Sequence, residues 1–468
     1  MKLKKVNQDL NEKQIDLSEI VLNEEQQKLF ERLENSKNHI FITGKAGTGK
    51  STLLQYFKQN SNKELVVVAP TGVAALNVGG QTIHSLFKFP LGFIARNSLK
   101  SIDDKTKILL KNVETVVIDE ISMVRADLMD AIDHRLRQSK GNDLAFGGVQ
   151  IVMFGDMYQL PPIVDSELAK YFAENMEGFY FFNASVWRDG GLQIYELKEI
   201  IRQRDETFKS ILNLIREGNV NERDLSELNK RAYLDIPTDG VIMLATRNRT
   251  VSEINQGRLD NLNGKVFSYR AVVSGELKEG EFPTEEILNL KKGAQIMLLR
   301  NDRLKRWVNG TLGYIEELSE DEIKVNIDGN IYSLPLESWE KVKYFYDATS
   351  RKVKEEVISS FTQYPLRLAW AITIHKSQGQ TYTSVAIDME SGAFAHGQTY
   401  VALSRCTNLE GLYLRRAISE RDVIVDPNII GFMNQITVSD IEENDLQTKF
   451  GDTESGSRVK LGDTESGS

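Results

Sequence analysis

Gly44-Lys45-Ala46-Gly47-Thr48-Gly49-Lys50-Ser51 runs directly out of the apolar segment 40–43 and into the amphipathic residues 53–57. This order predicts a strand, a phosphate-binding loop and a helix. The pattern G-x-x-x-x-G-K-[ST] needs glycines because backbone N–H groups must close around phosphate oxygens. Lys50 is expected to reach the β- and γ-phosphates and Ser51 to bind Mg²⁺, while the positive end of the helix favours the same anion. We therefore predict a nucleoside triphosphate site at this loop.

Length and composition place few limits on function. The 468 residues are 41% hydrophobic, which is enough for two or three cores, and carry a formal net charge of -9. This acidic total does not indicate a nucleic-acid partner. It does not exclude one either, because such binding depends on a local basic track. Cys406 is the single cysteine, so an intramolecular disulfide framework and a Cys-rich zinc site are excluded.

The sequence also indicates where the protein works. It contains no run of about eighteen apolar residues, so we expect no membrane span and no membrane partner. Residues 1–19 mix Lys with Asp and Glu and lack an apolar block, which argues against a secretory signal or a mitochondrial presequence. We expect an intracellular protein, which in a bacterium would be cytoplasmic and nucleoid-associated.

Three further apolar runs have the length of buried strands and end in polar residues. Residues 65–69 lead to Pro70-Thr71-Gly72, residues 115–118 to Asp119-Glu120, and residues 150–154 to Gly155-Asp156. Such runs are typical of a parallel sheet that is covered on both faces. Because parallel strands place ligands at their carboxyl ends, we expect these polar residues to share one sheet edge with the phosphate-binding loop.

Asp119 and Glu120 are candidates for the catalytic half of the nucleotide site. One carboxylate would bind Mg²⁺, usually through water, and the next would orient the attacking water. The alternative is a strand end with two solvated acids, which the phosphate-binding loop upstream makes the minority interpretation. Gln159, just past the fourth strand, is a candidate sensor of the γ-phosphate. Its alternative role is a turn residue ahead of Pro161 and Pro162.

Gln26 has two interpretations that its spacing leaves open. Asn23, with Gln26 three residues later, fits a capping box at the start of an amphipathic helix. A glutamine just upstream of a phosphate-binding loop can instead bond to the edge of an adenine base.

The second half of the chain repeats the apolar strand pattern without a second phosphate-binding loop. Residues 241–245, 368–372 and 384–388 predict a partner lobe that completes the first site. Between them, from about residue 302 to 361, short alternating stretches joined by turns such as Asp328-Gly329-Asn330 predict a small inserted β-barrel. The polar residues after 437 contain Gly-Asp-Thr-Glu-Ser-Gly-Ser twice and are expected to be a disordered tail.

The motifs in this order resemble those of the superfamily-one helicases of the RecD and Pif branch. The matching segments are Gly44 to Ser51, Ala69-Pro70-Thr71-Gly72-Val73-Ala74-Ala75, Thr82-Ile83-His84-Ser85-Leu86-Phe87, Ile118-Asp119-Glu120, Gly155-Asp156-Met157-Tyr158-Gln159-Leu160-Pro161-Pro162, Ile374-His375-Lys376-Ser377-Gln378-Gly379 and Tyr400-Val401-Ala402-Leu403-Ser404-Arg405. Residues 121–148, which join the acidic motif to the next strand, resemble the Pif-type signature. The resemblance covers residues 22–434.

The resemblance implies an α/β fold with two RecA-like parallel-sheet lobes, a wedge insertion in the first and an SH3-like β-barrel inserted in the second. Members of this family bind ATP in the cleft between the lobes, move 5′ to 3′ on single-stranded DNA and unwind the duplex ahead. We therefore expect ATP and Mg²⁺ as cofactors and a role in genome maintenance. One rival is a DNA-dependent ATPase that remodels nucleic-acid complexes without processive unwinding. Another is a P-loop switch or kinase that does not act on nucleic acid.

Family placement favours the adenine contact for Gln26 and adds two cationic groups. Arg405 and Arg202 are implied to complete the γ-phosphate site from across the cleft, where an arginine offsets transition-state charge. The alternative for each is a surface ion pair. The implied catalytic residues are Lys50, Glu120, Gln159, Arg202 and Arg405; the nucleotide-binding residues are Gln26, Gly44, Gly47, Thr48, Gly49, Lys50, Ser51 and Gly379; the metal ligands are Ser51 and Asp119.

DNA contacts are expected on the opposite edge of both lobes. The candidates are Pro70, Thr71, Gly72, His84 and Phe87 in the first lobe, and Asn248, His375, Lys376 and Ser377 in the second. Backbone amides, hydroxyls and lysine suit phosphates, whereas Phe and His can stack on unpaired bases. The expected partners are single-stranded DNA and forked or tailed duplex DNA, with G-quadruplex and RNA–DNA hybrids left open. The free protein is expected to be a monomer.

The expected domain boundaries follow from these assignments. Residues 1–21 form an N-terminal arm, 22–84 and 113–192 the first lobe, 193–302 and 362–436 the second lobe, 303–361 the β-barrel, and 437–468 the tail. Residues 85–112, which carry aromatic and basic side chains, are expected to form either the strand-separating wedge or a satellite core under a loop.

Overall fold

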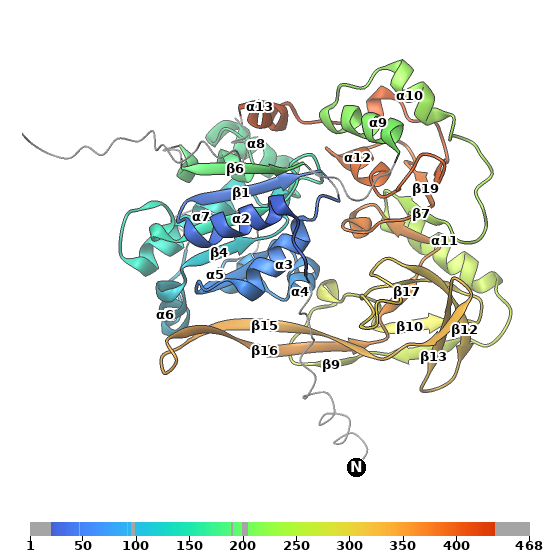
Figure 1. Cartoon of the computed structure of the whole chain (residues 1–468), viewed down its shortest axis with the longest axis horizontal. Helices are drawn as coiled ribbons and strands as arrows, with labels where there is room; N and C mark the ends of the chain where they lie inside the picture. The colour runs from blue at the N-terminus through green and yellow to red at the C-terminus, as the bar shows by residue number, and fades with distance from the viewer. Residues whose placement is uncertain are drawn as a thin grey trace, which may run out of the picture.

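The computed structural model describes residues 20–45, 47–90, 92–94, 99–188, 191–198 and 205–435. These residues form two parallel sheets flanked by helices, with antiparallel strands inserted between two strands of the second sheet (Figure 1). The expected α/β fold class is confirmed. The arm and tail predicted at 1–21 and 437–468 lie almost wholly outside the described residues.

The first lobe is a six-stranded sheet in the order β3-β2-β4-β5-β1-β6, and all its strand pairs are parallel. The strands are β1 His39–Gly44, β2 Leu65–Ala69, β3 Gln81–Thr82, β4 Thr115–Ile118, β5 Gln150–Phe154 and β6 Leu192–Leu197. Strand β6 pairs with β1 along its whole length. The first lobe therefore extends to Leu197, beyond the expected boundary at 192.

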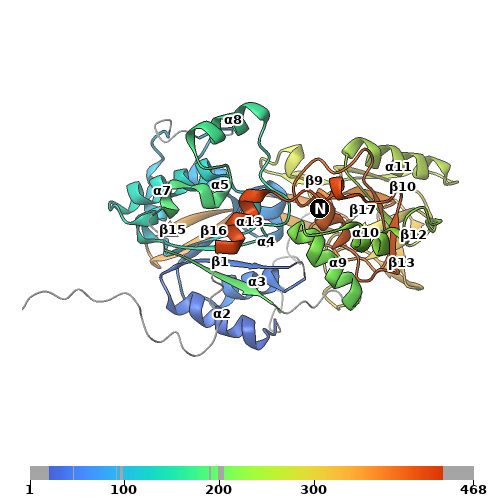
Figure 2. The ribbon, with the colours of Figure 1, turned by 90° about the horizontal axis from the view of Figure 1, so that it is seen from above.

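Helices cover both faces of this sheet. Helices α2 Glu24–Asn35 and α3 Lys50–Asn60 lie on one face and α7 Ala126–Lys140 on the other (Figure 2). Strand residues alternate accordingly, because Ile40 packs with α2 and α3 whereas Phe41 packs with α7. The other helical segments of this lobe are α4 Gly72–Val78, α5 Ile83–Phe87, α6 Asp104–Asn112, α8 Ser166–Asn175, η2 Ile121–Met123, η3 Ala145–Gly148, η4 Phe181–Asn183 and η5 Ser185–Trp187.

The second lobe has a smaller parallel sheet in the order β18-β7-β19-β20. Its strands are β7 Ile242–Ala245, β18 Ala371–Thr373, β19 Val385–Asp388 and β20 Leu412–Leu414. Its helical segments are α9 Glu206–Glu217, α10 Glu222–Asn229, α11 Asn248–Asn261, α12 Gln398–Leu403, α13 Pro427–Gln435, η7 His375–Ser377 and η8 Glu420–Asp422. Helix α13 returns to the first lobe, where Phe432 stacks on Phe182 with ring centroids 4.0 Å apart.

Antiparallel strands are inserted between β7 and β18. They are β8 Phe267–Arg270, β9 Val272–Ser274, β10 Ile287–Leu290, β11 Gln295–Leu298, β12 Leu312–Leu318, β13 Ile323–Ile327, β14 Asn330–Ser333, β15 Glu337–Asp347, β16 Lys352–Gln363 and β17 Leu366–Leu368, with the short helix η6 Glu279–Glu281. They form sheets in the orders β14-β13-β12-β11-β17, β15-β16-β9 and β10-β8. The insertion thus runs from β8 to β17, well beyond the expected limits of 303 and 361, because its closing strands come from flanking sequence.

The long hairpin β15–β16 of the insertion lies along the first lobe (Figure 1). The backbone N–H of Val67 in β2 donates to the Tyr344 hydroxyl at 3.2 Å, and the Tyr344 N–H donates to Gln81 Oε1 at 3.2 Å. Strand β3 is only two residues long and leaves the start of β2 without a ladder partner on that side. The hairpin therefore covers an exposed sheet edge.

The described residues of the segment 85–112 pack mainly into the core of the first lobe. Phe87 and Phe89 are buried and stack on each other, and Ile94 N–H donates to the buried carboxylate of Asp127 at the start of α7. Phe93 is partly exposed and contacts Tyr171 edge-on, with centroids 4.5 Å apart. These contacts favour the satellite core for most of the segment and leave Phe93 as its exposed aromatic side chain.

None of the helices in the described ranges has the length and apolar composition that a helix crossing a bilayer needs.

His39 in β1 makes the first lobe sensitive to acid. Burial lowers the pKa of His39 to about 4, against a smaller opposing effect of Asp133, and its ring packs on Phe146 and Trp187. Between pH 6.5 and 4 the unfolded chain binds a proton that the folded chain does not. Stability is therefore lost as pH falls through this window, by up to about 3 kcal/mol from this group.

We expect His39→Asn to reduce this loss, because Asn has no proton to gain and its carbonyl can accept from Ile151 N–H as Nδ1 does. Thermal unfolding is measured at about pH 7 and about pH 5. The drop in melting temperature should be smaller in His39→Asn than in the wild type. The exposed His134 provides the control His134→Asn, which should behave as the wild type. Equal drops in all three proteins would contradict the assignment.

Candidate active site

The glycines of the predicted phosphate-binding loop adopt backbone angles that favour glycine. Gly44, Gly47 and Gly49 all have positive φ angles, of 149°, 88° and 81°. A Cβ at Gly44 would lie 2.8 Å from the Leu197 carbonyl oxygen, so this position admits no side chain. Lys50 begins α3, and its Nζ donates to the carbonyl oxygens of Gly44 and Lys45 at 2.6 and 3.0 Å. Its ammonium group therefore lies over the loop, where phosphate oxygens would bind.

The acidic pair lies at the carboxyl end of β4, facing this loop. Glu120 has φ of 50°, a left-handed conformation that is costly for a residue other than glycine and is common at functional sites. Burial raises the pKa of Asp119 to about 6 and that of Glu120, with a further contribution from Asp119, to about 7. A carboxylate whose pKa lies near neutrality is suited to accept a proton from water.

The segment after β5 places Gln159 and Asp156 next to the acidic pair. Gln159 Nε2 donates to Asp156 Oδ2 at 3.4 Å, and both side chains are buried. Burial would raise the pKa of Asp156, but the charges of Arg216 and Lys50 outweigh it and hold this pKa below its usual value. Asp156 is therefore ionised and acts as a hydrogen-bond acceptor.

The second lobe contributes Arg405, Gly379 and Thr381 to the same cleft. Arg405 is 1% exposed and its guanidinium donates to the carbonyl oxygens of Val401, Ser377 and Gln380. Burial lowers the pKa of Arg405, and the nearby Glu120 opposes this effect. The guanidinium is thus held at the cleft by its own lobe and faces the acidic residues of the other.

These groups enclose a cleft of about 420 Å³ between the two lobes. Its lining consists of Gly47, Thr48, Gly49, Lys50, Ser51, Thr52, Asp119, Glu120, Gly155, Asp156, Gln159, Gly379, Thr381 and Arg405. The structure therefore brings together most of the predicted nucleotide-site residues from both lobes. Arg202 lies outside the described residues.

Ser51 and Asp119 both line this cleft, which is the placement that the predicted Mg²⁺ site requires. A hydroxyl and a carboxylate are the hard oxygen donors that Mg²⁺ binds, usually together with phosphate oxygens and water. The donor set therefore fits this ion.

Gln26 forms the predicted capping box and also reaches the phosphate-binding loop. Asn23 Oδ1 accepts from Gln26 N–H at 2.8 Å, and Gln26 Oε1 accepts from Asn23 N–H at 3.1 Å. Gln26 Nε2 donates to the Gly49 carbonyl oxygen at 3.3 Å. The structural role is present, and the adenine contact stays a prediction.

Two of the expected DNA contacts are buried in this structure. Phe87 is fully buried against Phe89, so its ring is not exposed for stacking on a base in this arrangement. Ser377 is also fully buried, and its hydroxyl donates to the Ile374 carbonyl oxygen at 2.7 Å. Both residues lie in short helical turns. The motif alone does not show which side chains of such a turn face the core.

The other DNA candidates lie at or near the surface. Thr71, Asn248, His375 and Lys376 are exposed, and Pro70, Gly72 and His84 are partly buried. Gly72 begins α4, where an added Cβ would meet Glu281 Cγ of η6 at 2.8 Å. The inserted domain therefore covers part of the expected track in this arrangement.

Sequence reasoning missed the contacts that join the lobes beside the cleft. Arg216 of α9 and Tyr400 of α12 both contact Asp156. Tyr400 stands in the same motif as Arg405, but the motif does not indicate that its hydroxyl bonds to Asp156. Arg216 follows Phe208 and Leu212 at a spacing of four, so a cation on the apolar face of a helix was the available signal.

Comparisons with known proteins point to one family. A family model described as PIF1-like helicase matches residues 21–226. The chain is 33% identical over 430 residues to the ATP-dependent DNA helicase Pif1 of Bdellovibrio bacteriovorus, covering 89% of this chain and 92% of that protein.

Solved structures of Bacteroides Pif1 share the fold at 38% identity. The crystal structure in complex with ADP-AlF4 gives a TM-score of 0.83, and the crystal structure bound to ssDNA gives 0.64. Each match covers 89% of this chain and 97% of the other. Similarity of this extent, in sequence and in fold, over nearly the whole of both chains means that this chain belongs to the PIF1-like helicase family.

Proposed function

We propose that this protein is an ATP-dependent DNA helicase that moves 5′ to 3′ on single-stranded DNA and unwinds the duplex ahead. One observation carries the proposal: a single cleft contains Lys50 and Glu120 from the first lobe and Arg405 from the second. A nucleotide in this cleft contacts both lobes at once. Its binding and hydrolysis therefore change the distance between the lobes, which is the movement that a translocating motor needs.

The residues of the cleft divide the chemistry of hydrolysis among them. Water attacks the γ-phosphorus, its proton passes to Glu120, and the bond to the β,γ-bridging oxygen breaks to give ADP and phosphate. Lys50 binds the β- and γ-phosphates, and Arg405 stabilises the charge of the transition state. Ser51 and Asp119 would hold Mg²⁺, which would supply positive charge to offset that of the phosphates. Gln26 contacts adenine, and Arg202 is a second cation for the γ-phosphate.

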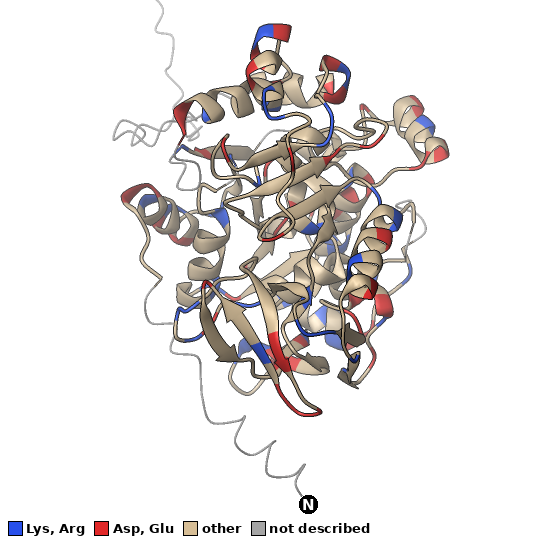
Figure 3. Ribbon diagram, turned by 90° about the vertical axis from the view of Figure 1, so that its right-hand side faces the viewer, with Lys and Arg blue, Asp and Glu red and all other residues tan. Residues whose placement is uncertain are grey.

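The DNA track runs over Pro70, Thr71, Gly72 and His84 of the first lobe and Asn248, His375 and Lys376 of the second. Exposed lysine and histidine at the end of β18 suit a phosphate and a base. Figure 3 shows Lys and Arg interspersed with Asp and Glu over the side that carries the second lobe and the insertion. DNA affinity is therefore expected to come from a few local cations and not from a wholly basic face.

The proposed function is tested by unwinding of partial duplexes that carry either a 5′ or a 3′ single-stranded tail. Unwinding that requires ATP and the 5′ tail supports the proposal. Unwinding from the 3′ tail would reverse the polarity. ATP hydrolysis stimulated by DNA without unwinding of either substrate would favour an ATPase that remodels nucleic-acid complexes.

Lys50→Ala should abolish ATP hydrolysis and unwinding, by at least about 10²-fold, because the loop loses the ammonium group that binds the phosphates. Binding of single-stranded DNA, measured by fluorescence anisotropy, should be largely retained, since Lys50 lies in the cleft and not on the track. DNA-stimulated hydrolysis at the wild-type rate would refute the assignment of this loop.

Arg405→Ala should lower the turnover of DNA-stimulated ATP hydrolysis by about 10³-fold. The affinity of this variant for a fluorescent ATP analogue should fall by less than about tenfold, because an arginine finger acts mainly on the transition state. Steady-state kinetics and equilibrium titration measure the two quantities separately. Losses of equal size would indicate a role in binding alone.

Lys376→Ala should weaken the binding of single-stranded DNA and make it less dependent on salt. A plot of log affinity against log salt concentration should lose about 0.7 from its slope, the value for one phosphate contact on a single strand. Lys28→Ala, on the outer face of α2, is the matched control and should leave the slope unchanged. An unchanged slope in Lys376→Ala would remove this residue from the track.

A further inference from the structure

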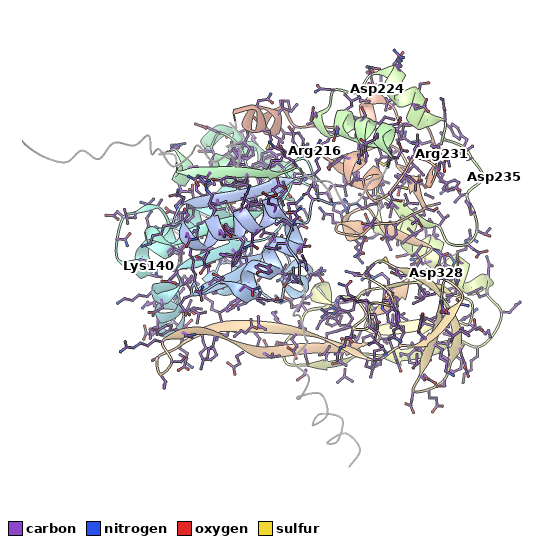
Figure 4. All side chains as sticks on the ribbon, in the orientation of Figure 1. Lys140, Arg216, Asp224, Arg231, Asp235 and Asp328 are labelled. Carbon is purple, nitrogen blue, oxygen red and sulfur yellow. The ribbon has the colours of Figure 1, made fainter. Side chains whose placement is uncertain are left out.

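Arg216 forms a buried ionic contact between the two lobes, close to the nucleotide cleft. It belongs to α9, which packs on α12 of the second lobe, and it is 4% exposed. Its Nη2 lies 3.2 Å from Asp156 Oδ1 and 3.6 Å from Glu196 Oε1, both in the first lobe. Its guanidinium also lies over the Tyr158 ring, 4.2 Å from the centroid. Figure 4 shows Arg216 where α9 approaches the end of β6.

The Asp156 carboxylate receives hydrogen bonds from both lobes. Oδ1 accepts from the Tyr158 N–H at 3.2 Å and from Arg216. Oδ2 accepts from Gln159 Nε2 and from the Tyr400 hydroxyl, each at 3.4 Å. Both distances to Oδ2 are at the long end of the hydrogen-bond range. Of these two bonds, that from Tyr400 crosses between the lobes, so closer approach of the lobes would strengthen it.

The contact with Asp156 fixes the direction of the Gln159 amide. An ionised carboxylate can only accept hydrogen bonds, so it must face the NH₂ group of the amide. Gln159 lines the cleft, so the carbonyl oxygen is the end of its amide that is left to point into the cleft. An oxygen acceptor at this place suits the attacking water, whereas it would repel a phosphate oxygen.

The second lobe also contacts the backbone of Gln159 and of the two residues before it. His396 Nε2 bonds to the Met157 carbonyl oxygen at 2.9 Å. Gly397 precedes α12, and a Cβ there would lie 2.3 Å from the Tyr158 carbonyl oxygen and 2.7 Å from that of Gln159. Arg405 lies two residues after the end of α12. A movement of this helix therefore shifts both Arg405 and the contacts that the second lobe makes with the backbone at Gln159.

We propose that Asp156 and Arg216 are positioning residues for hydrolysis: Asp156 turns the Gln159 carbonyl toward the cleft, and Arg216 with Tyr400 makes this orientation depend on contact with the second lobe. The Gln159 carbonyl then accepts a hydrogen bond from the attacking water. The inference rests on the proposed ATPase function of the cleft. Closure of the lobes then orients the attacking water and brings Arg405 to the γ-phosphate in one movement.

The test is a double-mutant cycle with Tyr400→Phe, which removes one hydroxyl and keeps the ring. Single-turnover hydrolysis with saturating single-stranded DNA should slow about fivefold, the effect of losing one hydrogen bond of ordinary net strength, as suits a bond 3.4 Å long, with KM for ATP unchanged. In a Gln159→Ala background the same substitution should have no further effect, because the amide that it orients is gone. A fivefold loss in both backgrounds, or a parallel change in KM, overturns the proposal.

Variants of Arg216 provide a second measurement. Arg216→Met removes the guanidinium that bonds to Asp156 and should slow hydrolysis more than Tyr400→Phe, whereas Arg216→Lys keeps the charge and should recover most of the rate. Equal rates for the Lys and Met variants, each folded by circular dichroism, would also overturn the proposal. If Arg216→Met does not fold, the Tyr400→Phe cycle decides alone.

Tyr180→Phe is the matched control. Tyr180 is also a buried tyrosine whose hydroxyl donates to a carboxylate, that of Asp426 at 2.7 Å, but it has no bond to Asp156 or Gln159. The hydrolysis rate of Tyr180→Phe should equal that of the wild type. A loss as large as that of Tyr400→Phe would contradict a specific role of the Tyr400 hydroxyl. Failure of the proposed function itself looks different, since the wild type would then show no DNA-stimulated hydrolysis.

Discussion

The concentrated negative charge of a bound triphosphate is the constraint on which this architecture depends. The first lobe offers one ammonium group, the loop amides and the N-terminus of α3, but it also places Asp119, Glu120 and Asp156 at the same sheet edge. The extra positive charge comes from Arg405 of the second lobe. A catalytic site divided in this way is complete only when both lobes are in position, and this ties hydrolysis to a change of shape.

The contacts beside the cleft keep the lobes together while allowing such a change. Helix α13 of the second lobe lies on aromatic residues of the first, and Tyr180 bonds to Asp426 just before that helix. On the far side of the molecule, the hairpin β15–β16 of the insertion holds the edge of β2. The insertion also reaches the first lobe through η6, which lies against Gly72 on the expected track.

Local signals explain what the sequence predicts well. The phosphate-binding loop, the acidic pair and the buried strands are each encoded within a few consecutive residues, so the first sheet and most of the cleft could be expected in advance. The errors involve partners distant in the chain. Strand β6 is recognisable only from its pairing with β1, and the hairpin β15–β16 only from the sheet edge that it covers. Phe87 looks like a stacking residue until its burial is known.

The Arg216–Asp156 pair is hard to explain by stability alone. Removing two charges from water costs several kcal/mol for each ion, and the attraction between them often does no more than offset this cost. A pair of apolar side chains could fill the same space with no such loss. What apolar side chains could not provide is an acceptor that binds Gln159 on one side and groups of the second lobe on the other. The ionic pair is therefore better explained by function: through Asp156, the position of the second lobe affects the orientation of Gln159 in the first.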